Sequence, residues 1–210
     1  MHFTSVLFLL AGLLGTNAVD IIGYSQTGCT ANSVVMVCAA AVLRTCCNFP
    51  RAGPQVQSVQ FINLEYQYLA VVFESTRTSF CGINHSATPG SQMPICLPGI
   101  LSDFGGSGAM WLKLTALSGQ PNPEDSQGAN GVEAVVENQT CSGSAIPTIL
   151  GWEGKGVWVL QLEEGEAWDR YNELPTLDPE DVTTYIETLK EFGAEWHANA
   201  SEHPIAAKFL

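Results

Sequence analysis

The sequence predicts a mostly β protein: an antiparallel β-sandwich or barrel-like sheet clamped by disulfides, with one C-terminal amphipathic α-helix. Three observations lead to this fold class. Short runs of β-branched and aromatic residues recur along the chain, and glycine- and proline-rich segments separate them. Seven cysteines occur in 210 residues, and none forms a CxxC motif. A helical spacing of apolar residues is found near the C-terminus.

Residues 20–50 form an apolar, cysteine-rich region. The run 33–43 has no hydrophobic period, so it fits a buried strand or a buried helix. Glycine and proline run through 84–108 and 118–131, which are therefore predicted to be long loops. The clearer strand candidates are 56–64, 68–74, 110–117, 132–136, 146–150 and 157–162.

The C-terminal segment has the signals of a helix. Asp178 suits the N-cap and Pro179 the first helical position. Apolar residues then follow at helical spacing from Val182 to Trp196, with glutamates on the opposite side. We expect one amphipathic helix of about four turns, packed on the sheet. The alternative is a detachable helix that docks on a partner.

The first 18 residues have the organisation of a secretory signal peptide. An apolar run over 6–14 is too short to cross a bilayer, and Thr16 and Ala18 stand at the −3 and −1 positions of a cleavage site. The alternative is a buried N-terminal helix. We expect cleavage after Ala18, a secreted, extracellular location and no membrane anchor. The mature chain is then one domain over 19–210, β-rich over 19–162, with an acidic helical tail over 163–210.

The cysteines are expected to form disulfides, because export leads through an oxidising compartment and no Cys/His spacing suits zinc. Neighbouring residues of an extended chain point to opposite sides, so Cys46 and Cys47 should bond to different partners. The spacing leaves the pairing open. Cys141 stands apart from the others and is the candidate for a free thiol or for a link to a second chain. The disulfide candidates are Cys29, Cys38, Cys46, Cys47, Cys81 and Cys96.

Three N-x-S/T sequons, at Asn84, Asn138 and Asn199, predict N-glycosylation at the surface.

The net charge of −13 comes entirely from residues 121–210, and an acidic surface repels phosphate backbones. Nucleic-acid binding is therefore excluded, and binding to anionic membranes is disfavoured. The acidic residues fit a solvated face, with a basic partner or a weakly held calcium ion as alternatives.

No catalytic motif is complete. The segment 23–28, GYSQTG, is similar to the nucleophile elbow of cutinases, but Thr27 separates the serine from the glycine that the motif needs. His197 and His203 lie near glutamates at spacings that match no standard metal pair. The region 163–181 contains too many carboxylates for two of them to be chosen as the catalytic pair of a glycoside hydrolase. Five tryptophans would suit a sugar-stacking platform, but Trp111 and Trp158 lie in predicted strands, where core packing is the commoner role.

Four short segments resemble a pattern found in small secreted cysteine-rich proteins of filamentous fungi. They are GYSQTGC at 23–29, the Cys46–Cys47 pair, SVQFINL at 58–64 and SGAMW at 107–111, and the resemblance spans about half of the chain. It implies secretion and disulfides. Some members act as effectors or toxins, and the class carries no catalytic residues over to this chain.

These observations favour a non-enzymatic, effector-like secreted protein that acts by binding an extracellular protein or glycan, with no cofactor and no metal. The alternative is a secreted hydrolase or carbohydrate-active protein with carboxylates dispersed in the sequence. The first hypothesis predicts a surface groove without a converging acid, base and nucleophile. The second predicts a cleft with two carboxylates about 5–10 Å apart.

Overall fold

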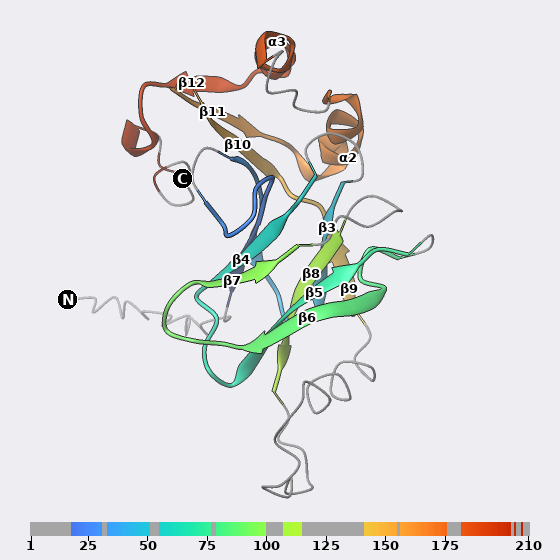
Figure 1. The fold of residues 1–210 in the computed structure, drawn as a ribbon. Coiled ribbons are helices and arrows are strands. Elements are labelled where there is room, and N and C mark those ends of the chain that lie inside the picture. Colours follow the sequence, from blue (N-terminus) through green and yellow to red (C-terminus); the bar gives the residue numbers. More distant parts are fainter. Residues whose placement is uncertain are drawn as a thin grey trace, which may run out of the picture.

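The computed structural model describes residues 18–30, 33–50, 55–76, 79–99, 107–114, 141–154, 156–175 and 182–202, together with positions 204 and 207. Most of these residues belong to two β-sheets and their connections, and helices cover one end of the larger sheet (Figure 1). The predicted fold class is confirmed: the protein is mostly β, has three disulfides and carries a short C-terminal helix. None of the described helices has the length and apolar character needed to cross a membrane.

The larger sheet has the strand order β12-β11-β10-β2-β1-β4-β7, and every neighbouring pair is antiparallel. Strand β1, which lies between β2 and β4, is buried along its whole length, as expected for a strand covered on both faces. The strands are β1 (Val19–Tyr24), β2 (Val34–Ala41), β4 (Ser58–Ile62), β7 (Ile95–Pro98), β10 (Ile149–Gly154), β11 (Gly156–Gln161) and β12 (Glu195–His197).

The smaller sheet has the order β6-β5-β8-β3-β9. Its pairs are antiparallel except for the short parallel pair of β3 and β9. The chain passes between the sheets in a tight turn after β2, where Arg44 takes a left-handed backbone conformation with φ of 63°. The strands are β3 (Thr45–Phe49), β5 (Tyr68–Glu74), β6 (Ile83–Pro89), β8 (Ser107–Lys113) and β9 (Gly143–Ala145).

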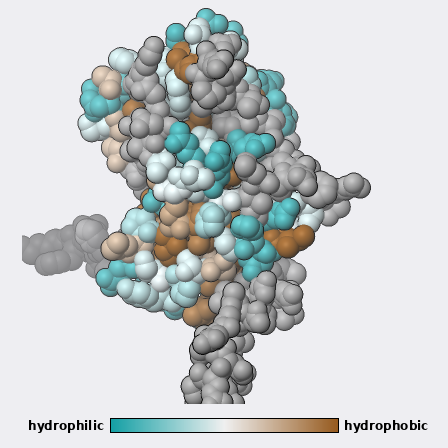
Figure 2. Space-filling view, in the orientation of Figure 1, coloured by the Kyte–Doolittle hydropathy of each residue, from teal (hydrophilic) through white to brown (hydrophobic). Residues whose placement is uncertain are grey.

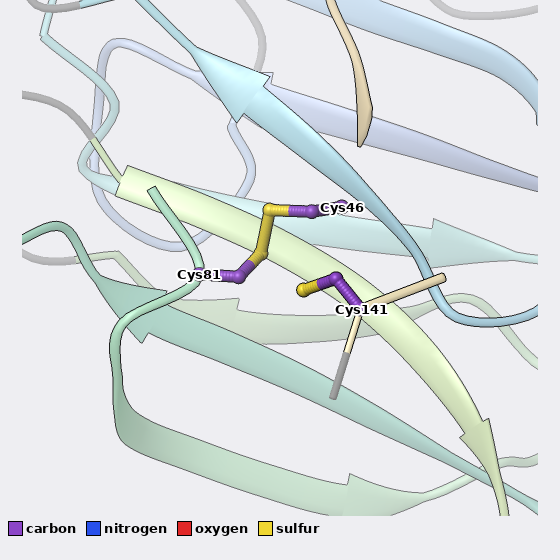
Figure 3. Close-up of side chains that lie close together, drawn as sticks. All are labelled: Cys46, Cys81 and Cys141. Atoms are coloured by element: carbon purple, nitrogen blue, oxygen red, sulfur yellow. A yellow bond between two sulfur atoms is a disulfide. The ribbon is translucent and has the colours of Figure 1, made fainter. Parts of the chain in front are cut away.

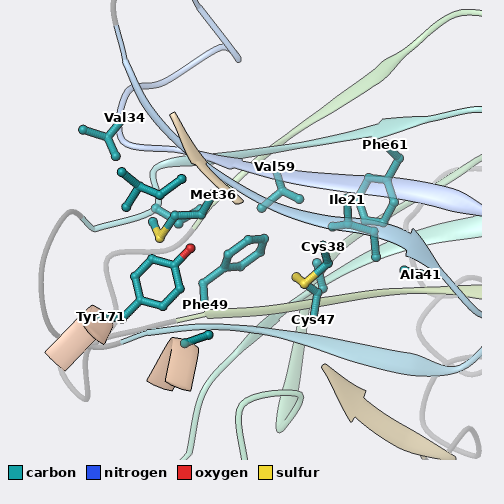
Figure 4. Close-up of a cluster of buried hydrophobic side chains, with 14 of the residues drawn as sticks. Ile21, Val34, Met36, Cys38, Ala41, Cys47, Phe49, Val59, Phe61 and Tyr171 are labelled. Atoms are coloured by element: carbon teal, nitrogen blue, oxygen red, sulfur yellow. A yellow bond between two sulfur atoms is a disulfide. The ribbon is translucent and has the colours of Figure 1, made fainter. Parts of the chain in front are cut away.

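The main hydrophobic core lies between the two sheets (Figure 4). Alternate residues of β1, β2 and β4 meet alternate residues of β3, β5 and β8 there, which is the period of two that a strand imposes. On the far face of each sheet a smaller cluster is also buried. One holds Ile22, Val35 and Val37, and the other holds Val71 and Met110.

Helices α2 (Glu164–Glu173) and α3 (Val182–Glu191) complete this core, and the 3₁₀ helix η1 (Ala200–Glu202) follows β12. Tyr171 of α2 is fully buried in the core (Figure 4). Tyr185 of α3 packs edge-on against Trp152 of β10, with ring centroids 5.9 Å apart. The helices therefore cover β10 and β11, next to the smaller sheet (Figure 1).

The C-terminal helix is shorter than predicted. It ends at Glu191, because Gly193 takes a left-handed conformation with φ of 87°. The N–H of Gly193 donates to the carbonyl of Lys190, and that of Ala194 donates to the carbonyl of Leu189. This pair of bonds is a Schellman motif, which ends a helix. Trp196, expected at the end of the helix, lies instead in β12. The predicted caps at 178 and 179 lie outside the described residues.

The predicted loop 84–108 is wrong in part, because it contains β6 and β7. Both are edge strands, one in each sheet. Edge strands are half exposed, and each of these ends in a proline, which a central strand does not tolerate. The ambiguous run 33–43 forms strand β2. The strand predicted at 132–136 and the loop predicted at 118–131 lie outside the described residues.

Candidate binding groove

Three disulfides join six of the seven cysteines: Cys29–Cys96, Cys38–Cys47 and Cys46–Cys81. The prediction that Cys46 and Cys47 bond to different partners is confirmed. Cys47 faces the main core, where its bridge to Cys38 joins β3 to β2 across the sandwich. Cys46 points to the other side of β3, and its bridge reaches Cys81, whose neighbours are the apolar residues on the far face of the smaller sheet.

Cys141 carries a free, exposed thiol that lies beside the Cys46–Cys81 bridge. The three sulfur atoms all lie within 4.8 Å of one another, and Figure 3 shows the Cys141 side chain pointing toward the bridge. The Cys141 Sγ also lies 3.9 Å from the Met110 Sδ. Burial of its sulfur raises the pKa of Cys141, while a hydrogen bond from its own backbone and the charge of Arg44 oppose that rise.

The described sequons have different surroundings. Asn199 is exposed, and its Nδ2 donates to the Glu202 Oε1 at 2.7 Å. Asn84 is half-buried on edge strand β6, and its Oδ1 is buried without a hydrogen-bond partner among the described residues. Asn138 lies outside the described residues. Asn199 is therefore the more accessible of the two described sites.

Ser25 belongs to the turn between β1 and β2. Its Oγ lies 3.1 Å from the Ser33 Oγ and accepts a hydrogen bond from the N–H of Val34 at 2.9 Å. The backbone N–H of Ser25 donates to the carbonyl of Val34. These contacts close the turn, so the serine has a structural role where the incomplete elbow motif occurs.

Among the described residues, the other candidates for chemistry form no cluster of three or more His, Asp or Glu side chains. The described carboxylates of residues 163–173 are exposed around α2, and Glu173 pairs with Arg170 at 3.5 Å. His197 Nε2 lies 3.6 Å from the Glu195 Oε2, and His203 lies outside the described residues. The hydrolase hypothesis required two carboxylates facing one cleft, and the exposed carboxylates of α2 do not meet that requirement.

The tryptophans serve mainly in packing. Trp111, Trp152 and Trp158 are buried in the main core. Trp196 on β12 is 52% exposed, and nothing is described for the Trp168 side chain. A platform of several exposed tryptophans is therefore absent among the described side chains. The aromatic residue that is most exposed among them is a tyrosine, Tyr66, at 62%.

Tyr66 lies at an open hollow of about 490 Å³ that is lined by the β4–β5 connection and the β6–β7 connection. Figure 1 shows these two connections at the same end of the molecule. In this part of the surface Figure 2 shows teal and pale atoms mixed with a few brown ones. We call this hollow the Tyr66 groove. It is lined by Asn63, Leu64, Glu65, Tyr66, Gln67, Ser91 and Gln92.

The backbone builds the Tyr66 groove from two distant segments. Asn63 directly follows β4 and takes a left-handed conformation with φ of 66°, which asparagine tolerates better than most residues. The buried Leu64 then anchors the connection. The second segment passes so close that a Cβ on Gly90 would lie 2.0 Å from the carbonyl oxygen of Glu65, so only glycine fits there. The N–H of Gly90 donates to the carbonyl of Tyr68 at 2.7 Å.

The lining of the groove is suited to binding and lacks the groups of an assembled catalytic site. Asn63, Gln67 and Gln92 offer amide donors and acceptors, and the phenol ring of Tyr66 offers an exposed flat face. Glu65 supplies one carboxylate, which accepts a hydrogen bond from the Gln67 Nε2. Among the described residues that line it there is no histidine and no second carboxylate.

A second hollow of about 480 Å³ lies at the open edge of the sandwich, where the end of β2 faces β9. Small residues line it, among them Ala39, Ala40 and Ser144, and Val42 is exposed at 56% beside them. Its described lining residues include no charged side chain and no aromatic ring. Its lining offers less directional recognition than that of the Tyr66 groove.

Sequence reasoning missed the groove residues. The signal in the sequence is the run NLEYQ at 63–67, where polar residues surround an aromatic one at the end of the strand predicted over 56–64. No protein-family model matches the chain, and no match was found among curated proteins or among solved structures.

Proposed function

We propose that this protein is secreted, acts outside the cell without catalysing a reaction, and binds a glycan through the Tyr66 groove. Three disulfides are typical of a protein that matures in an oxidising compartment, which supports an extracellular role. The effector-like proteins that the sequence resembles would act in the same setting. The observation that carries the proposal is a tyrosine, Tyr66, that is 62% exposed at a hollow lined by amide side chains.

A glycan fits the chemistry of this groove better than an apolar peptide does. Sugar hydroxyls donate and accept hydrogen bonds, as do the amides of Asn63, Gln67 and Gln92. The C–H face of a pyranose ring is apolar and flat, so it can stack on the Tyr66 ring. An apolar peptide would need a larger dry surface, and most side chains of the groove are polar.

Tyr66→Ala is expected to weaken glycan binding at least tenfold, because tyrosines at the centre of a binding site are frequent hot spots. The measurement is a screen of the wild-type protein on a glycan array, followed by titration calorimetry with the best ligand. Because Tyr66 is exposed, the substitution should change the free energy of unfolding by less than about 0.5 kcal/mol. Tyr66→Phe keeps the stacking face and is expected to retain most of the affinity.

Ile83→Ala is the matched control, since it removes an exposed apolar side chain of β6 that does not line the groove. Glycan binding that is equally strong in the wild-type and Tyr66→Ala proteins would contradict the proposed site. A different result would overturn the ligand class but support the groove as the binding site. In that case no glycan on the array is bound, the wild-type protein captures an extracellular protein, and Tyr66→Ala abolishes this capture.

Export is expected to leave Val19 as the first residue and to attach a glycan to Asn199. Strand β1 begins at Val19, directly after the expected cleavage point, so every described strand lies in the expected mature chain. The test is N-terminal sequencing and intact mass of the protein secreted by a eukaryotic host. Asn199→Gln should remove one glycan mass. A secreted product that retains Met1 and carries no glycan would contradict this prediction.

A further inference from the structure

We propose that Cys46, Cys81 and Cys141 form a thiol–disulfide exchange site in which one bridge is shared among three sulfur atoms. The proposal goes beyond glycan binding and does not depend on it. It rests on geometry: a free thiol and both atoms of a disulfide lie within 4.8 Å of one another (Figure 3). Exchange occurs when a thiolate attacks a disulfide sulfur, and these groups are already side by side.

The fold brings the three cysteines together on the far face of the smaller sheet. Cys46 lies on β3, and its partner Cys81, which precedes β6, packs against the cluster that contains Met110. Cys141 lies two residues before β9, and the N–H of the intervening Ser142 donates to the carbonyl of Arg44 at 2.9 Å. That bond and the parallel pairing of β9 with β3 hold the Cys141 backbone next to the bridge.

The exchange is balanced without an external oxidant or reductant. The Cys141 thiolate forms a bond to one sulfur of the bridge, the Cys46–Cys81 bond breaks, and its electron pair goes to the other sulfur, which takes up a proton. The number of disulfides and the number of thiols are unchanged. The reaction moves the free thiol from one position of the fold to another.

The burial of the two residues that form the bridge indicates the direction of the attack. Cys46 is 3% exposed, whereas Cys81 is half-buried. A thiolate released at Cys46 would lose more hydration than one released at Cys81. Attack at the Cys46 sulfur is therefore favoured, and the product has a Cys46–Cys141 bridge and a free Cys81. The segment that contains Cys81 then loses its covalent link to β3.

The rate of exchange should follow the thiolate fraction of Cys141. Burial raises the pKa of this thiol, so little thiolate is present at neutral pH, and the positive charge of Arg44 opposes the rise. Below that pKa the thiolate fraction grows about tenfold per pH unit. The bridge should therefore persist as Cys46–Cys81 in mildly acidic surroundings and exchange as the pH rises.

The test uses the full mature protein with no added thiol or oxidant. Samples are incubated at pH 6, 7 and 8, quenched in acid, alkylated under denaturing conditions at low pH and digested without reduction for mass spectrometry. We expect a Cys46–Cys141 peptide and alkylated Cys81, formed about ten times faster for each pH unit. Circular dichroism before the quench should be that of the folded protein.

Two controls isolate Cys141. In the Cys141→Ser variant, Cys46 and Cys81 are expected to stay bonded to each other. The same result is expected for wild-type protein whose Cys141 is alkylated in the folded state, and this second control needs no substitution. A Cys46–Cys81 bridge that is unchanged after days at pH 8, with Cys141 still fully open to alkylation, would overturn the proposal. A main product bridged between Cys81 and Cys141 would overturn the assignment of Cys46 as the attacked sulfur.

Discussion

Replacing both Cys29 and Cys96 with serine is expected to lower the free energy of unfolding by about 4 kcal/mol. This bridge spans 67 residues, the widest separation of the three disulfides, and the chain entropy that a crosslink removes from the unfolded state grows with the length of the closed loop. The bridge also ties β7, a four-residue edge strand, to the turn after β1.

The measurement is urea denaturation of the variant and the wild type under non-reducing conditions. Cys38→Ala with Cys47→Ala is the matched comparison, because that bridge spans only 9 residues. Loop entropy alone assigns it about 3 kcal/mol. If opening Cys29–Cys96 cost less than about 1 kcal/mol, the view that this bridge restrains the unfolded chain would be wrong.

The turn that carries Cys29 shows why its bridge also matters in the folded state. The N–H of Cys29 donates to the Ser58 Oγ at 2.9 Å, and that hydroxyl donates to the carbonyl of Gln26 at 2.6 Å. Ser58 is completely buried at the start of β4. The turn is therefore attached to β4 by hydrogen bonds and to β7 by the disulfide, and these links hold the edge of the larger sheet in register.

The sequence predicts the buried strand β5, but its strand candidates include neither β1, which the fold buries along its whole length, nor β3. The run 68–74 was expected to be a strand, and β5 is Tyr68–Glu74, with only its two end residues partly exposed. The dense β-branched and aromatic residues of β5 reveal it by composition, whereas β1 and β3 contain Asp20, Gly23 and a cysteine pair. Strand β6 has the sequence INHSATP, whose polar residues are those of a loop. Its strand geometry comes from pairing with β5, and a single sequence does not encode that partner.

The Tyr66 groove could not be predicted for a related reason. It exists because Gly90 lies against the backbone of Glu65, and these residues are 25 positions apart. The sequence gives the residue types but does not reveal that contact. The sulfur cluster is similar: Cys141 stands alone in the sequence, and the pairing of β9 with β3 brings it to the Cys46–Cys81 bridge. Tertiary contacts thus define both features.

Trp111→Ala is expected to destabilise the protein by about 3–5 kcal/mol, the range for removing a large aromatic side chain from a core. Trp111 lies on β8 of the smaller sheet and is 2% exposed. Its Nε1 donates to the carbonyl of Ala41 on β2 at 2.9 Å, so one side chain joins the two sheets. Tyr68 packs edge-on against its ring, with centroids 4.8 Å apart.

Two further substitutions separate the contributions of Trp111, each measured by urea denaturation. Trp111→Phe keeps an aromatic ring and removes the hydrogen bond to Ala41, so most of the stability should remain, with about 1 kcal/mol lost for the bond itself. Trp196→Ala removes a tryptophan of β12 that is 52% exposed, and its effect should stay under about 1 kcal/mol. Equal losses for Trp111→Ala and Trp196→Ala would mean that the contact between the sheets at Trp111 does not hold the sandwich closed.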